Sequence, residues 1–366
     1  MRGFCAFYVV IFHAKFILWS GGRQYLATHP RAAWQPLDYL VFGLDMGGAA
    51  GYEMVIFFFA LSGFFIRYAQ LRKHRRPLAF YLNRIVRVYP PYLASVLVAC
   101  LVLSIIGALL PHVMTGAPER ELNPHLLLAW QTVQDFRFLN FLRVLGFLKN
   151  GGLYTGYNEV YWSLLPEALF YLGIPLFFWR IRAYYLISGL LYTSNLFNQA
   201  GIGLDFPVSS YLLTYNLYFA LGALLYDVVV QTEWLNWVRR VPGVVLSAVI
   251  VLFGLMLGAA TLQFKVLSGL LAALLASLSI SALLAGKVAR QNPLVRVMHT
   301  LGIFSFSLYL YHFPLLVLCY AGVVWLTGDL IIYARYYWLA VPLVTLVSYG
   351  LYWVTERVSV NYFRKV

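Results

Sequence analysis

The chain alternates between long apolar runs and short polar connections that are rich in basic residues. Long, predominantly apolar runs include Leu93–Leu110, Val208–Val230, Val241–Leu262 and Val266–Leu284. A helix needs roughly 20 residues to cross a hydrocarbon core of about 30 Å, so each run is long enough to span a bilayer. Because the runs are continuous and do not alternate with polar positions, they predict helices and not barrel strands. We therefore expect an all-α integral membrane protein.

Applied to the whole chain, the same pattern predicts about ten transmembrane helices. These lie near residues 4–19, 50–66, 91–110, 160–179, 183–199, 208–229, 241–262, 264–285, 302–326 and 337–355. An even number of spans places both termini on one side. If that side is the cytoplasm, 18 of the 27 lysine and arginine residues lie inside, eight lie outside, and Lys15 falls within the first helix. This distribution follows the positive-inside rule, so both termini are predicted to be cytoplasmic.

Composition agrees with a membrane protein and excludes an ordinary soluble domain. Hydrophobic residues make up 62% of the 366 residues, charged residues make up 11%, and the mean hydropathy is +0.75. The net charge of +14 is largely explained by topology, so we expect no nucleic-acid partner. Residues 1–366 are interpreted as one transmembrane domain with no appended soluble domain, in direct contact with the lipid bilayer.

Cysteine usage and short motifs exclude several kinds of chemistry. Cys5, Cys100 and Cys319 each lie in an apolar run without a second cysteine or a histidine cluster nearby, which argues against a disulfide framework and a zinc site. The chain has no Walker P-loop, no G-x-S-x-G elbow and no H-E-x-x-H motif. We therefore expect no bound metal and no nucleotide hydrolysis.

Among the ionisable residues within predicted spans, the candidates for function are His13, Glu53, Glu167 and His312. Such groups are costly in a membrane and are functional candidates for that reason. On the first helix, Arg2 and His13 are eleven residues apart, which places them on one face about 16 Å apart along the axis. The alternative for His13 is a core histidine whose ring is satisfied by a nearby carbonyl, and spacing does not separate the two.

Two further segments combine polar groups with helical spacing. Pro166 cannot donate a backbone hydrogen bond, so it predicts a local kink just before Glu167. That carboxylate is equally consistent with a catalytic role and with a structural hydrogen bond to another helix. Ser305, Tyr309 and His312 share one helical stripe, which could be a polar seam between helices or the wall of a substrate cavity.

The connection from Arg67 to Pro91 is the densest cationic segment of the chain. Pro77 is predicted to start a short helix and Pro90-Pro91 to end it. Arg84 and Arg87 lie one turn apart on that helix. Topology alone explains basic residues there, but a paired set of guanidinium groups also suits an anionic cytosolic ligand that carries phosphates.

Together these segments resemble the acyltransferase-3 family of bacterial integral-membrane acyltransferases, over nearly the whole chain. The resemblance rests on Arg2-Gly3 with His13 ten residues later, Gly51-Tyr-Glu-Met-Val-Ile-Phe-Phe-Phe-Ala-Leu-Ser-Gly-Phe-Phe-Ile66, Phe80-Tyr-Leu-Asn-Arg-Ile-Val-Arg-Val-Tyr-Pro-Pro91, Trp162-Ser-Leu-Leu-Pro-Glu167 and Ser307-Leu-Tyr-Leu-Tyr-His312. Ala168 departs from the pattern, because family members often carry a polar residue after the glutamate.

The resemblance implies transfer of an acyl group, expected to be acetyl, from a coenzyme A thioester to a hydroxyl of a carbohydrate or glycolipid acceptor, in the bacterial inner membrane. On this interpretation His13, Glu167 and Glu53 are catalytic, and Arg2, Arg84 and Arg87 bind acyl-coenzyme A. The residues expected to bind the acceptor are Trp162, Ser163, Ser305, Tyr309 and His312. The rival hypothesis is a transporter or flippase of a lipid-linked sugar or metabolite, against which the lack of inverted repeats argues. A structural scaffold is a third possibility, but it gives His13 and Glu167 no purpose.

Overall fold

A computed structural model of the chain describes residues 1–20, 22–73, 77–118, 120–198, 209, 211–286 and 292–364. The described residues are mostly α-helical, and none of them forms a β-strand. The chain folds into two compact units, each assembled from three separate stretches of sequence. Unit 1 contains Met1–Cys5, Ala50–Arg84 and Leu165–Thr300, and unit 2 contains Ala6–Ala49, Ile85–Leu164 and Leu301–Val366.

The helices of the first half of the chain are α1 (Arg2–Leu18), α2 (Gly22–Thr28), η1 (Arg31–Ala33), α3 (Pro36–Gly47), α4 (Gly51–Lys73), α5 (Pro77–Leu109), α6 (His112–Thr115), α7 (Leu122–Gln134), α8 (Phe138–Leu145), η2 (Glu159–Ser163) and α9 (Leu164–Trp179). Those of the second half are α10 (Ile181–Asn198), η3 (Tyr211–Tyr215), α12 (Asn216–Gln231), α13 (Trp234–Arg240), α14 (Pro242–Thr261), α15 (Lys265–Leu284), α16 (Pro293–Ile303), α17 (Ser305–Thr327), α18 (Tyr337–Val354) and α19 (Glu356–Arg364). Short 3-10 helices form η1 and η2, and η3 is a π-helix.

Within the described residues, eight helical stretches are long and apolar enough to cross a membrane. They are Pro36–Arg72, Pro77–Leu109, Glu159–Trp179, Tyr211–Gln231, Pro242–Thr261, Lys265–Leu284, Ser305–Thr327 and Tyr337–Asn361. These stretches confirm the predicted all-α membrane fold. The other two predicted spans correspond to α1, which has 17 residues, and α10, which has 18. Ten spans and cytoplasmic termini remain predictions. Residue 199, where one predicted span ends, and residue 208, where the next one begins, lie outside the described residues.

The prediction that a helix ends at Pro90-Pro91 is wrong. Helix α5 continues through both prolines for 33 residues. Proline removes a backbone donor from a helix, so continuation needs packing and other partners for the carbonyls it leaves. Tertiary contacts pack this stretch of α5 within unit 2: the Tyr311 hydroxyl donates to the Pro91 carbonyl at 3.2 Å, and the Tyr92 hydroxyl donates to the Val144 carbonyl at 2.9 Å.

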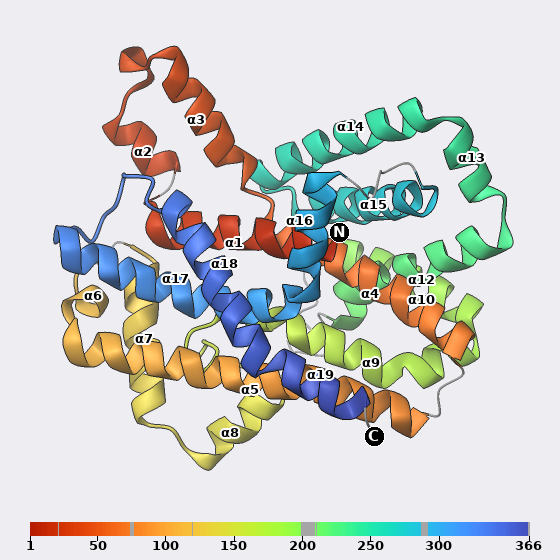
Figure 1. Cartoon of the computed structure of the whole chain (residues 1–366), viewed down its shortest axis with the longest axis horizontal. Helices are drawn as coiled ribbons and strands as arrows, with labels where there is room; N and C mark the ends of the chain where they lie inside the picture. Colours follow the sequence, from red (N-terminus) through yellow and green to blue (C-terminus); the bar gives the residue numbers. More distant parts are fainter. Residues whose placement is uncertain are drawn as a thin grey trace. The chain divides into compact units, whose positions relative to one another are not determined.

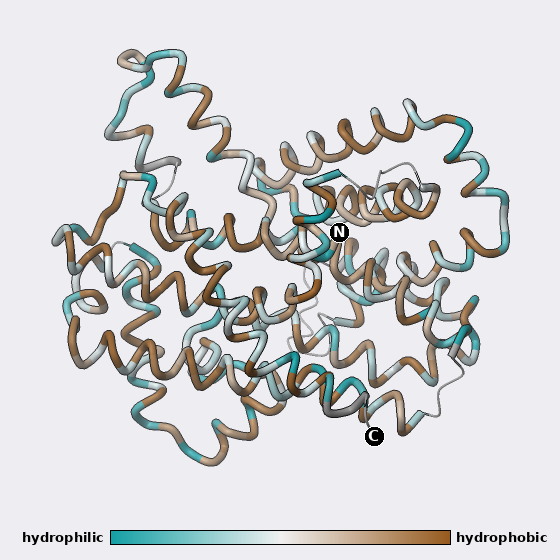
Figure 2. Tube along the Cα trace, viewed as in Figure 1, coloured by the Kyte–Doolittle hydropathy of each residue, from teal (hydrophilic) through white to brown (hydrophobic). Residues whose placement is uncertain are grey.

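In unit 1, helix α4 packs against α12 and α15, while α14 and α15 lie side by side (Figure 1). Two glycines bring α4 and α12 together: a Cβ on Gly63 would meet the Phe219 carbonyl, and a Cβ on Gly222 would meet the Ala60 carbonyl. Small residues of this kind let two helix backbones approach closely inside a membrane. Figure 2 shows hydrophobic residues along α14 and α15 and hydrophilic residues at α13, as expected for two spans and a polar connection.

In unit 2, helix α17 is the central element and packs against α18 and η2. Most of the residues of α17 from Ser305 to Val324 are buried. An ion pair between the buried Asp45 and the partly exposed Arg335 fixes another part of the unit: Arg335 Nε lies 2.9 Å from Asp45 Oδ2, and the Tyr337 hydroxyl donates to Oδ1 of the same carboxylate. The candidate residues Ser305, Tyr309 and His312 therefore lie on α17, a helix that is largely buried by its neighbours.

Candidate active site

His13 and His312 meet in unit 2, although 299 residues separate them in the sequence. His13 lies on α1 and His312 on α17, and His312 Nε2 lies 3.0 Å from His13 Nδ1. The His312 side chain is fully buried, whereas His13 is partly exposed. Two backbone carbonyls complete the arrangement: Leu308 O lies 3.0 Å from His312 Nδ1, and Val9 O lies 3.1 Å from His13 Nδ1.

These contacts determine where the protons lie when both rings are neutral. A carbonyl oxygen only accepts, so His312 Nδ1 carries the hydrogen that it donates to Leu308, and His312 Nε2 is left as an acceptor. His13 Nδ1 must then donate, because both of its neighbours are acceptors. The remaining lone pair of His13 is on Nε2, which has no hydrogen bond to any residue in the described ranges. His13 can therefore take up a proton at Nε2 without losing its bond to His312.

Aromatic rings of unit 2 hold the His13 ring from the side. Phe313 packs edge-on against His13 with ring centroids 5.4 Å apart, and Tyr157 packs edge-on against Phe313 at the same separation. The Tyr157 hydroxyl lies 3.2 Å from His125 Nδ1. Burial raises the pKa of the Tyr157 hydroxyl above its ordinary range, so this group stays protonated at neutral pH. Tyr157 therefore packs against Phe313 through its ring and offers a neutral hydroxyl group to His125.

The stripe on α17 forms hydrogen bonds with η2, which precedes Glu167. The Ser163 and Tyr309 hydroxyls lie 2.8 Å apart, and the Tyr309 hydroxyl donates to the Val160 carbonyl at 3.0 Å. Asn158 Nδ2 and Ser95 Oγ both donate to the Leu310 carbonyl, at 2.8 and 3.0 Å. These bonds tie α17 to η2 on the side of the helix that also carries His312. The predicted seam is thus present, one turn from the histidine pair.

The other members of the predicted acceptor set occupy different positions. Ser305 donates its hydroxyl to the Gly302 carbonyl at 3.1 Å, a local contact at the start of α17. Trp162 is half-buried on η2. Pro166 lies in the first turn of α9, where its missing donor costs little, and the chain changes there from a 3-10 to an α-helix. That change of helix type takes the place of the predicted kink.

Both candidate carboxylates lie in unit 1 and accept hydrogen bonds from hydroxyl groups. Glu167 accepts from the Tyr171 hydroxyl, one turn further along α9, and from Ser62 on α4 at 3.4 Å. Glu53 is 3% exposed and accepts from Ser268 on α15 at 2.6 Å. Because a carboxylate in an apolar setting is stabilised by such donors, both side chains are held in fixed positions.

Two of the three predicted donor-binding arginines gather near Glu167 in unit 1. The Arg84 guanidinium carbon lies 5.1 Å from the Tyr171 ring centroid and 5.5 Å from that of Phe80. Both Arg84 and Arg2 interact electrostatically with the Tyr171 hydroxyl. Arg84 Nε is buried and lacks a hydrogen-bond partner among the described residues. A buried donor without a partner is unusual and points to a ligand that supplies the acceptor.

Arg87, the third of these arginines, follows one turn later on α5 and is partly buried. It has no hydrogen bond or ion pair with another described residue.

The sequence interpretation had overlooked Tyr171, Ser62 and Ser268 as partners of the two glutamates. Tyr171 follows Glu167 by four residues, and this i, i+4 spacing was a usable signal. Ser62 and Ser268 come from other helices, so no local pattern identifies them. Within the described ranges, no group of three or more histidine, cysteine, aspartate or glutamate side chains is placed to hold a metal ion.

Comparison with known protein families identifies the family of the chain. The model of a family described as an acyltransferase domain matches residues 1–353 of the chain. No curated protein matches the chain, and no solved structure does. Because the family model covers nearly the whole sequence, including both histidines and all the candidate arginines, the chain belongs to the acyltransferase-3 family and is a multi-pass membrane acyltransferase.

Proposed function

We propose that this protein transfers an acyl group, most simply acetyl, from a coenzyme A thioester to a hydroxyl of a carbohydrate or glycolipid acceptor at the bacterial inner membrane. The observation that carries the proposal is the hydrogen bond between His312 and His13, which leaves His13 Nε2 as a lone-pair acceptor. A partly exposed neutral imidazole held in one tautomer, with its Nε2 lone pair directed away from His312, suits a general base. We assign that role to His13.

The transfer follows from this assignment in two steps. His13 Nε2 removes the proton of the acceptor hydroxyl while the oxygen attacks the thioester carbonyl carbon, giving a tetrahedral oxyanion. The oxyanion then collapses, the carbon–sulfur bond breaks, and the sulfur leaves with the bonding electron pair. The proton on His13 passes to that sulfur, which yields the ester and free coenzyme A and restores neutral His13. Throughout, Nδ1 of His13 keeps its hydrogen, so His312 stabilises the imidazolium without titrating.

Arg2, Arg84 and Arg87 are assigned to the anionic acyl donor. Coenzyme A carries phosphate groups, and guanidinium groups bind phosphates through charge-assisted and often bidentate hydrogen bonds. The buried Arg84 Nε, which has no partner among the described residues, fits such a ligand. Arg2 and Arg84 also share an electrostatic neighbour in Tyr171, so two of the three cations act on one region of unit 1.

The remaining candidates receive supporting roles. Glu167 and Glu53 keep the catalytic supporting role predicted from the sequence, and their hydroxyl partners hold them in place. The hydroxyls of Ser163 and Tyr309, together with Trp162 and Ser305, are assigned to the acceptor, whereas His312, whose two ring nitrogens are both engaged, is assigned to the positioning of His13. Polar groups at fixed positions are what a carbohydrate, with its many hydroxyls, requires.

Purified full-length protein in lipid nanodiscs tests the proposal directly. With acetyl-coenzyme A and an extract of cell-envelope carbohydrate, we expect release of free thiol together with stoichiometric formation of O-acetyl ester. His13→Gln keeps much of the size of the side chain but cannot take a proton, so turnover should fall by about 10²–10⁴-fold while donor binding persists. A transporter would release no thiol above background, and near wild-type turnover by His13→Gln would remove His13 from the mechanism.

A further inference from the structure

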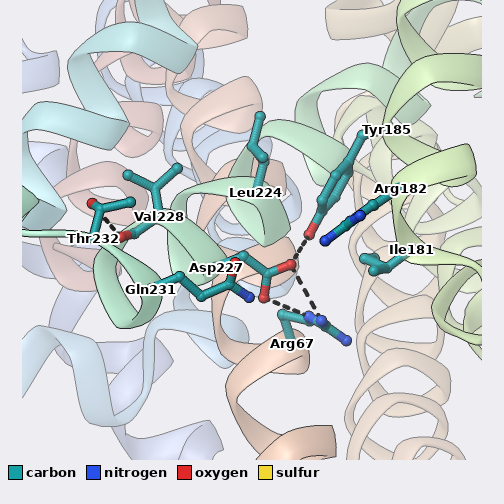
Figure 3. Close-up of a pocket in the computed structure, with 9 residues that line it drawn as sticks. All are labelled: Arg67, Ile181, Arg182, Tyr185, Leu224, Asp227, Val228, Gln231 and Thr232. Atoms are coloured by element: carbon teal, nitrogen blue, oxygen red, sulfur yellow. Dashed lines mark hydrogen bonds and ion pairs between the residues drawn. The ribbon is translucent and has the colours of Figure 1, made fainter.

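A pocket of about 360 Å³ lies within unit 1, and its lining includes neither the histidine pair nor the candidate donor arginines (Figure 3). It lies where the C-terminal parts of α4 and α12 meet the start of α10. Its lining residues are Arg67, Ile181, Arg182, Tyr185, Leu224, Asp227, Val228, Gln231 and Thr232. The charge pattern predicts that all three of these helix ends are cytoplasmic. Their meeting in one pocket agrees with that prediction, because the ends that form one pocket must lie on the same side of the membrane.

The floor of the pocket is a buried ion pair. Arg67 Nε lies 2.8 Å from Asp227 Oδ1, and Arg67 Nη2 lies 3.2 Å from Oδ2. The Tyr185 hydroxyl donates to Oδ2 at 2.7 Å. The two charged side chains are each 10% exposed, so this contact is shielded from solvent. Asp227 therefore has both oxygens engaged, and its charge is compensated by Arg67.

The mouth of the pocket holds donors that lack acceptors. Figure 3 shows the Arg182 side chain extending past Tyr185 toward the ion pair. Neither Arg182 nor the Gln231 amide has a hydrogen bond or ion pair with another described residue, and both are exposed. Two arginines face one aspartate, so one positive charge remains after Arg67 and Asp227 are paired.

We propose that this pocket binds a phosphate group, with Arg182 as its principal contact and Gln231 as a second donor. A tetrahedral anion supplies several acceptor oxygens to the unengaged N–H groups and neutralises the remaining positive charge. The proposal does not rest on the acyl-transfer mechanism, because none of the pocket residues belongs to the assigned base, donor or acceptor sites. Failure of one therefore leaves the other intact.

The position of the pocket is compatible with two sources of phosphate. Arg67 and Gln231 lie at the ends of two candidate spans, where phospholipid headgroups meet protein. Basic pockets between transmembrane helices on the cytoplasmic side commonly bind anionic headgroups. Ile181, Leu224 and Val228 add an apolar wall that suits the upper part of an acyl chain. A soluble phosphate would bind to the same donors without using this wall.

Two variants of adjacent arginines separate the pocket from its basic surroundings. Arg182→Gln removes the guanidinium from the pocket, whereas Arg180→Gln makes the same charge change at an exposed position that stacks near Trp179 and does not line the pocket. Native mass spectrometry of the detergent-solubilised full chain would measure binding of phosphatidylglycerol, with diacylglycerol as the phosphate-free control. Microscale thermophoresis would measure binding of inorganic phosphate.

We expect wild-type protein and Arg180→Gln to bind phosphatidylglycerol with equal affinity and to prefer it to diacylglycerol. Arg182→Gln should weaken phosphatidylglycerol binding about tenfold or more, as expected for loss of charge-assisted hydrogen bonds. If Arg182→Gln also weakens binding of inorganic phosphate, a free phosphate group is a sufficient ligand; if only the lipid is affected, the headgroup is the ligand. Equal binding by Arg182→Gln and wild type, or an equal loss in both variants, would overturn the proposal.

Discussion

His312 Nε2 accepts a hydrogen bond from His13 Nδ1 across 3.0 Å, and the other nitrogen of His312 is tied to the Leu308 carbonyl. In the proposed mechanism His312 has the role that a carboxylate has in catalytic carboxylate–histidine pairs: it selects one tautomer and one ring orientation of His13. Unlike a carboxylate, it is neutral and adds no charge to a buried site. The proposed base therefore depends on a second residue that itself performs no proton transfer.

Replacing His312 should consequently lower turnover without weakening donor binding. We expect His312→Ala to reduce kcat by about 10–100-fold, in the range found when an orienting partner is removed. His312→Gln should recover part of the loss, because its amide oxygen can accept from His13 Nδ1. Steady-state kinetics with acetyl-coenzyme A measures kcat and the KM for the donor separately.

The exposed His112 offers a matched control, since His112→Ala makes the same substitution far from any assigned role in unit 2. It should leave both constants unchanged. If His312→Gln proved as inactive as His312→Ala while folding normally, the accepting atom would not be what matters, and His312 would have only a packing role.

Arg84 and Arg87 should contribute to donor affinity. In the double variant Arg84→Gln, Arg87→Gln, coenzyme A should bind about 10²–10⁴-fold more weakly, since each of the two charge-assisted contacts is worth about 1.5–3 kcal/mol. The corresponding lysine variants should restore only part of the affinity if the contacts are bidentate. Isothermal titration with coenzyme A measures the effect.

Tyr171→Phe provides the control for Arg84. It keeps the ring on which the guanidinium stacks and removes the hydroxyl that donates to Glu167. Donor affinity should change little in this variant. Full affinity in the double glutamine variant would return Arg84 and Arg87 to a role in topology alone.

The pattern of hydrophobic and polar residues predicted the helical fold but not the contacts between distant segments. The apolar runs predicted a helical membrane fold, and that prediction is confirmed because hydrocarbon thickness constrains length and hydropathy directly. The break expected at Pro90-Pro91 was wrong, and the packing of this stretch includes the Tyr311 hydroxyl, which reaches the Pro91 carbonyl from 220 residues away. Helix propensity carries no information about such a partner.

The candidate site divides in the same way. The sequence identified His13 and His312 separately, because each is an ionisable group in an apolar run. Their contact depends on the tertiary structure, so no local pattern predicts it. Arg67 was predicted only as a topological charge, and its partner Asp227 was not noticed at all. Roles for His13, the glutamates and the arginines remain predictions that the proposed variants test.

Topology is testable with single cysteines in a background in which Cys5, Cys100 and Cys319 are replaced by alanine. Arg72→Cys lies near the exposed end of α4, in the segment predicted to be cytoplasmic, and should react with a membrane-impermeant maleimide only after permeabilisation. Asp329→Cys, exposed in the connection after α17, should react in intact cells. Labelling of Arg72→Cys in intact cells would reverse the predicted orientation.

The approach of α4 to α12 depends on glycine at two positions. A Cβ on Gly222 would fall on the Ala60 carbonyl oxygen, and one on Gly63 would fall on the Phe219 carbonyl oxygen. Both obstacles are backbone atoms, so no side-chain rotation relieves them and the helices must move apart. The same pair of helices carries Arg67 and Asp227, whose ion pair requires the close approach.

Gly222→Ala should therefore destabilise the protein by about 1–3 kcal/mol, the usual cost of forcing extra volume into a packed contact. The thermal unfolding midpoint of the detergent-solubilised protein measures the change. Gly254→Ala is the matched control: Gly254 lies within α14, and a Cβ there meets no atom within 4 Å. Since alanine is the better helix former by about 0.5–1 kcal/mol, that variant should be as stable as wild type or more stable. If Gly222→Ala, like Gly254→Ala, unfolded at the wild-type temperature or above it, the added methyl group would have found room between the helices. The close packing of α4 against α12 would then be contradicted.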